Sequence, residues 1–149
     1  LCHCHYAIRH LHTDETMPKL ILSIAATYGF IAVALGAFAA HGLKGKLAPE
    51  LLGAFQTGVQ YQMYHALALL VVGLWLKQAT RHNTVWLNSA SGLFMLGTVL
   101  FSGSLYALTL TGIGFFGPIT PLGGICLLLG WLCLLMAALT SSKDFSTST

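Results

Sequence analysis

Three uncharged stretches of the chain carry the side chains best suited to bind a ligand or move a proton. His65 lies in the middle of one of them, far from any charged residue. An imidazole can exchange a proton near neutral pH or ligate a metal, and hydroxyl and carboxamide groups both donate and accept hydrogen bonds. The candidate polar cluster comprises His41, Gln56, Gln60, Tyr61, His65, Ser102, Ser104, Tyr106 and Thr120.

These residues do not form a motif of known catalytic or cofactor chemistry. The sequence has no catalytic triad pattern, P-loop or glycine-rich dinucleotide motif, and its long apolar stretches contain no Asp or Glu. Haem needs two histidines at similar depth on facing helices, whereas His41 ends one helix and His65 lies about 21 Å along the next. We therefore expect no enzyme activity and no cofactor.

The first sixteen residues are rich in cysteine and histidine, which raises the question of a metal site. Zinc sites favour spacings such as C-x₂-C and H-x₃-H, and the C-x-C and H-x-H pairs in this segment do not match them. We expect no metal. Because Met17 resembles a natural start, residues 1–16 are interpreted as a disordered or non-native extension.

The elements that position the polar cluster follow from composition. Of 149 residues, 56% are hydrophobic and 7% are charged, whereas soluble domains carry about 25% charged residues. Residues 82–142 contain no charged side chain. This pattern excludes a soluble enzyme, a disordered segment and a nucleic-acid-binding protein, and it indicates an integral membrane protein in contact with the lipid bilayer.

The apolar segments predict four membrane-spanning helices. About 20 apolar residues cross the hydrocarbon, and the glycines and proline of residues 111–119 divide the longest stretch. Thr120 is expected to cap the last helix, with Pro121 at its first position. The fold class is all-α, an integral membrane antiparallel four-helix bundle in residues 17–142 with a polar tail at 143–149. The expected spans are residues 20–43, 51–76, 86–110 and 120–139.

Close packing of helices in lipid relies on small residues. The sequence predicts three packing seams of small residues, formed by Ala32, Gly36 and Ala40, by Gly103 and Ala107, and by Cys126 and Gly130. Five Lys or Arg residues are expected on the side of the termini and two on the other, which favours cytoplasmic (or matrix) termini.

The alternation of spans should bring the polar cluster to one end of the bundle. In span 51–76 the residues Gln56, Gln60, Tyr61 and His65 share an arc that we expect to face protein or water. Phe55 lies on the opposite, apolar arc. Two interpretations stay open: ordinary hydrogen bonds between helices, or a small polar cavity with His65 at its floor.

Five segments of this sequence resemble one family: Gly36–Leu43, Tyr61–His65, Phe101–Tyr106, Thr120–Gly124 and Gly130–Trp131. The chain is similar, over about residues 18–139, to the YgdD inner-membrane proteins of bacteria and their mitochondrial relatives of the transmembrane-protein-256 type. The resemblance implies a four-helix inner-membrane protein and no particular reaction, because the family is one of unknown function.

The first functional hypothesis is a structural or accessory membrane component that packs with itself as a homo-oligomer or with a larger membrane complex. The alternative is a transporter or channel-like protein that moves a small polar solute or proton through the cluster around His65. The expected location is the bacterial inner (plasma) membrane, with the mitochondrial inner membrane as the alternative.

Overall fold

The structure is a computed structural model that describes residues 2–141, with side chains described for residues 16–80 and 83–141. Its long helices are α1 (Cys2–Phe38), α2 (Pro49–Leu76), α3 (Arg81–Thr111) and α4 (Ile119–Ser141). A π-helix, η1 (Ala39–Leu43), continues α1, and a 3-10 helix, η2 (Gly114–Phe116), precedes α4.

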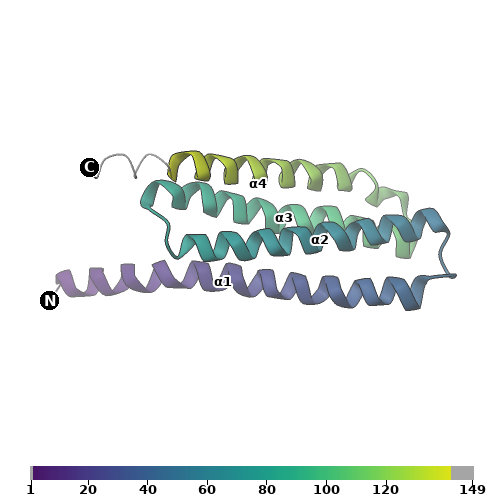
Figure 1. The fold of residues 1–149 in the computed structure, drawn as a ribbon, viewed down its shortest axis with the longest axis horizontal. Coiled ribbons are helices and arrows are strands. Elements are labelled where there is room, and N and C mark those ends of the chain that lie inside the picture. Colours follow the sequence, from purple (N-terminus) through teal and green to yellow (C-terminus); the bar gives the residue numbers. More distant parts are fainter. Residues whose placement is uncertain (1, 142–149) are drawn as a thin grey trace.

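The prediction of four membrane-spanning helices is confirmed. Within the described residues, four helical stretches are long and apolar enough to cross a membrane: Thr16–Leu43, Pro49–Leu76, Asn83–Thr111 and Gly114–Ser141. Successive helices run in opposite directions, and the start of α1 lies at the same end of the molecule as the end of α4 (Figure 1). The all-α, antiparallel membrane fold is therefore the one that the composition indicates.

The helix ends differ from the expectation in one respect, at the start of α4. The backbone of α1 continues through residues 2–16, and the interpretation of residues 1–16 as a disordered or non-native extension stays a prediction. The polar tail expected at 143–149 lies outside the described residues. The predicted cap is wrong: α4 begins at Ile119, and the Thr120 hydroxyl bonds to Ser104 instead of capping the helix.

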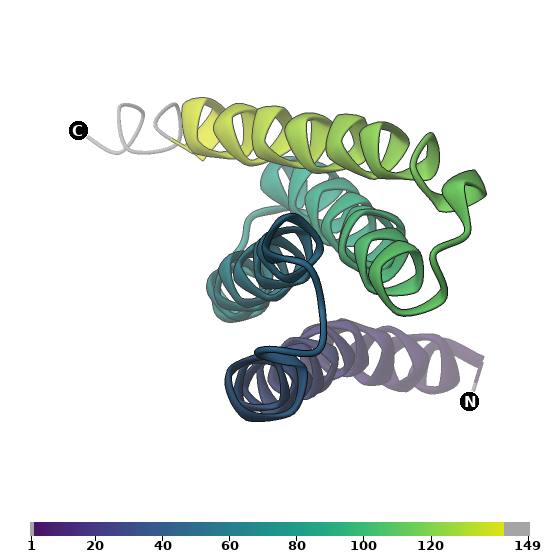
Figure 2. The ribbon, with the colours of Figure 1, turned by 90° about the vertical axis from the view of Figure 1, so that its right-hand side faces the viewer.

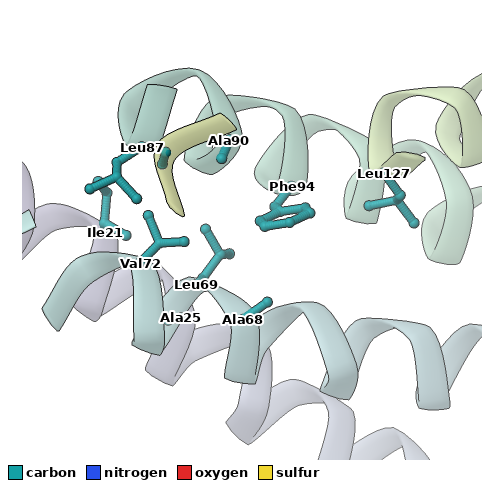
Figure 3. Packing of buried hydrophobic residues seen from close by; sticks show 10 residues of the cluster. Ile21, Ala25, Ala68, Leu69, Val72, Leu87, Ala90, Phe94 and Leu127 are labelled. Carbon is teal, nitrogen blue, oxygen red and sulfur yellow. The ribbon is translucent and has the colours of Figure 1, made fainter. Parts of the chain in front are cut away.

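Each long helix packs mainly against the next one in the sequence, so the bundle is open between α1 and α4. Seen end-on, α1 and α4 lie on opposite sides with α2 and α3 between them (Figure 2), and the extensive contacts join α1 to α2, α2 to α3 and α3 to α4. The main core gathers Ile21, Leu69, Val72, Leu87 and Phe94 from α1, α2 and α3 (Figure 3). The outermost helices α1 and α4 consequently leave broad apolar faces for lipid.

Glycines bring α3 and α4 into close contact. A Cβ placed on Gly123 would lie 2.4 Å from the Phe101 backbone nitrogen, and Gly130 and Gly97 meet the side chains of Phe94 and Leu127 in the same way. Such close approach is how small residues allow helices to associate in lipid. The α3–α4 pair is consequently the most tightly apposed pair in the bundle.

The predicted seams are correct in part. Ala32 is buried and Gly36 contacts Val59, but Ala40 is exposed. Gly130 lies in the α3–α4 contact as expected. Gly103 does not, because nothing lies within 4 Å of a Cβ built on it; the face of α3 that meets α4 is the one that carries Gly97 and Phe101.

Candidate functional site: a polar network at the centre of the bundle

A hydrogen-bonded network joins α1, α2 and α3 through Gln62, whose side chain is 6% exposed. Its Nε2 donates to the Tyr28 carbonyl in α1 at 2.9 Å, and its Oε1 accepts from the Tyr106 hydroxyl in α3 at 3.0 Å. The Tyr28 hydroxyl donates to the Met95 carbonyl of α3 at 3.2 Å. Both ends of the carboxamide are therefore engaged, and three helices are tied at mid-span.

His65 lies less than one helical turn beyond Gln62 and is 4% exposed. Its Nδ1 is 2.8 Å from the Tyr61 carbonyl, and its Nε2 is 3.2 Å from Nε1 of Trp131 in α4. A carbonyl only accepts and an indole N–H only donates, so Nδ1 carries the proton and Nε2 accepts. These partners assign one neutral tautomer to His65 and use both of its nitrogens.

Aromatic rings surround this imidazole. Its centroid lies 5.3 Å from that of Phe94 in α3 and 6.1 Å from those of Tyr61 and Trp131. The ring of Tyr61 in turn stacks on Phe101 at 4.5 Å. Tilted and edge-to-face contacts at these distances are favourable, so the packing holds the imidazole in place from α2, α3 and α4.

Smaller polar contacts lie toward the ends of the bundle. The hydroxyls of Ser104 and Thr120 are 2.7 Å apart and join the end of α3 to the start of α4. At the other end, the Thr140 hydroxyl donates to Oδ1 of Asn83 at 2.9 Å.

Among the described residues, three buried oxygens have no hydrogen-bond partner, and all are in α3: Asn88 Oδ1, Thr98 Oγ1 and Ser102 Oγ.

The structure brings together only part of the predicted cluster. His65 contacts Tyr61, and Ser104 contacts Thr120, while Tyr106 bonds to Gln62. The remaining predicted residues are Ser102, which is buried without a hydroxyl partner, and His41, Gln56 and Gln60, which are exposed.

The expectation that the whole polar arc of α2 faces the bundle interior needs correction. Only the edge of that arc, at Tyr61 and His65, meets other helices, because the buried face of α2 is centred on Phe55, Gln62 and Leu69. Gln56 and Gln60 lie on the opposite side of the helix. His41 lies in η1 with its side chain exposed.

Sequence reasoning missed the residues that complete the network: Gln62, Tyr28 and Trp131. Their common depth in the membrane is the signal that could have grouped them in the sequence, since all three lie near the middle of their spans. An amide, a phenol and an indole at mid-span need hydrogen-bond partners that lipid cannot supply.

Among the described residues, no group of three His, Cys, Asp or Glu side chains is placed to hold a metal ion.

The family model and the individual relatives that match this chain are all of unknown function, and the relatives are named as membrane proteins. Residues 35–124 match the model of a protein family described as "Protein of unknown function (DUF423)". The chain is 44% identical over 120 residues to the UPF0382 membrane protein YwdK of Bacillus subtilis, covering 80% of this chain and 96% of that protein. It is also 44% identical over 121 residues to the UPF0382 membrane protein SERP0230 of Staphylococcus epidermidis (81% and 96%).

A third relative is the UPF0382 inner membrane protein YgdD of Escherichia coli K12, at 41% identity over 121 residues, 81% of this chain and 90% of that protein. No solved structure gives a significant match. The matched segment runs from the end of α1 to the start of α4 and includes Gln62, His65 and the Ser104–Thr120 contact. By this identity and coverage, the chain is a membrane protein that belongs to the DUF423 family.

Proposed function

We propose that this protein is a non-enzymatic structural or accessory component of the bacterial inner (plasma) membrane, which packs with itself or with other membrane subunits. One observation carries the proposal: the polar atoms of Gln62 and His65 are engaged inside the bundle. A transport path needs side chains that can exchange partners with a passing solute. Here Gln62 and His65 hold helices together instead.

The connections between helices support the same proposal. Five residues (44–48) join η1 to α2 and four (77–80) join α2 to α3, so these two connections offer few residues for a site outside the membrane. Lys44 and Lys46 lie in the connection between η1 and α2, whereas Lys77 lies in the connection between α2 and α3, and Lys19 lies near the start of the first span. The excess of five Lys or Arg residues over two, expected from the sequence on the side of the termini, favours a cytoplasmic location for both termini.

A second candidate function is transport of a small polar solute or proton. The observation that favours it is the pair of buried hydroxyls of Thr98 and Ser102, which have no partner among the described residues. Being four residues apart, they lie on the same face of α3. A transporter would use such groups, together with His65, to replace water around its solute.

Flux measurements distinguish the two candidates. We expect vesicles that contain the purified protein and a trapped pH dye to conduct protons no faster than protein-free vesicles, and to swell in glycerol or urea at the same rate. The reason is that the hydrogen bonds at His65 and Gln62 would have to break for each solute that passes. Native electrophoresis in mild detergent should show an assembly larger than the monomer.

The matched control is His65→Ala, reconstituted at the same protein-to-lipid ratio. The structural proposal would give way to the transport one if the unmodified protein showed a flux and His65→Ala abolished it. The variant would have to keep the helix content of the unmodified protein.

A further inference from the structure

The outer face of α2 carries polar side chains where lipid is expected. Two glutamines, Gln56 and Gln60, are exposed on it. The exposed residues recur every three or four positions and form a stripe opposite the buried face, which we call the α2 outer stripe: Gly53, Gln56, Gln60, Tyr64, Leu67, Val71 and Leu74.

The two glutamines lie within the hydrocarbon. α2 has 28 residues and is therefore about 42 Å long, against about 30 Å of hydrocarbon. Gln60 lies about 16 Å from the start of the helix, close to its midpoint. Gln56 lies about one turn nearer the start of the helix. A carboxamide that faces acyl chains has no hydrogen-bond partner, which is strongly unfavourable.

We infer that the α2 outer stripe is the contact surface with a second copy of this chain. Copies inserted in the same orientation are related by a two-fold axis along the membrane normal. The two α2 helices then run parallel, and each residue of the stripe meets its own counterpart. This inference rests on the proposed function, in which the protein packs with itself, and it names the surface that does so.

The chemistry of the stripe fits a second copy. A carboxamide has an N–H donor and a C=O acceptor, so Gln60 can pair with Gln60 of the second copy through two reciprocal hydrogen bonds. None of the stripe residues is charged, so like residues meet without repulsion. Gly53 has nothing within 4 Å of a Cβ position, which lets the two backbones approach closely at that end.

The test is disulfide crosslinking in native membranes, in a background with the four cysteines replaced by alanine. We expect single cysteines at Gln60, Tyr64 and Leu67 to form dimers of twice the monomer mass on mild oxidation, because disulfides require Cβ atoms about 4 Å apart. Matched controls are Leu96→Cys and Leu128→Cys, on exposed faces of α3 and α4, which should stay monomeric.

A second measurement uses energy transfer between labelled copies in lipid vesicles. Gln60→Leu should weaken dimerisation roughly tenfold, as the loss of two hydrogen bonds in a membrane implies, whereas Leu96→Ala should leave it unchanged. Because the leucine faces outward and is apolar, this variant keeps a stable span.

Each outcome decides the inference. Equal crosslinking at stripe and control positions, or dimerisation unaffected by Gln60→Leu, overturns it. Crosslinks from the stripe to a different protein also overturn it but leave the proposed accessory function standing. A monomer that conducts protons or solute in a His65-dependent manner refutes both.

Discussion

Replacement of Gly123 with alanine is expected to lower the free energy of unfolding by about 3 kcal/mol, at the upper end of the usual cost of overpacking. The new Cβ would lie 2.4 Å from the backbone nitrogen of Phe101 and 2.7 Å from its Cα. Backbone atoms cannot rotate away as a side chain can, so α3 and α4 must separate along this contact. The measurement is reversible unfolding in mixed detergent micelles, followed by circular dichroism.

The matched control is the same substitution at Gly103, which lies in α3. Nothing lies within 4 Å of a Cβ at position 103, and alanine favours a helix over glycine by about 1 kcal/mol. This variant should therefore be as stable as the unmodified protein or slightly more so. Equal losses in the two variants would contradict the close contact between α3 and α4.

Replacement of Gln62 with leucine is expected to cost about 2 kcal/mol of stability, the typical cost of leaving a buried polar group unpaired. Leucine preserves much of the volume but leaves the Tyr106 hydroxyl without its acceptor and the Tyr28 carbonyl without this donor. The same unfolding measurement detects the loss.

A double-mutant cycle separates the hydrogen bond from packing. Tyr106→Phe removes the hydroxyl that Gln62→Leu would leave unpaired, so the double variant should lose clearly less than the sum of the two single variants. Additive losses would mean that Gln62 and Tyr106 do not depend on each other.

The spans were predictable because they depend only on the hydropathy and length of segments along the chain, and this pattern is strong. Uncharged stretches of sufficient length, divided by the glycines and proline after Thr111, specify four crossings regardless of how the helices pack. The end of the bundle at which Ser104 meets Thr120 also follows, since it requires only that successive spans reverse direction.

The site was less predictable because rotation about a helix axis is not encoded in polarity alone. In α2 both faces carry polar and apolar residues, so the arc of Gln56, Gln60 and His65 looked like the inward face. The packed face instead includes Phe55 and Gln62, where Gly58 allows the Tyr106 ring to approach. Which face turns inward depends on such contacts with neighbouring helices.

The bundle holds His65 in one neutral form, with Nδ1 protonated and Nε2 accepting from Trp131. Nitrogen-15 NMR of histidine-labelled protein in lipid bilayers at neutral pH tests it, with the His65 signals identified by their loss in His65→Gln. We predict one protonated and one unprotonated nitrogen, and a shift of the Nε2 signal alone in Trp131→Phe. Two protonated nitrogens, or exchange between tautomers through contact with water, would contradict this assignment of the His65 tautomer and indicate a hydrated, proton-exchanging site.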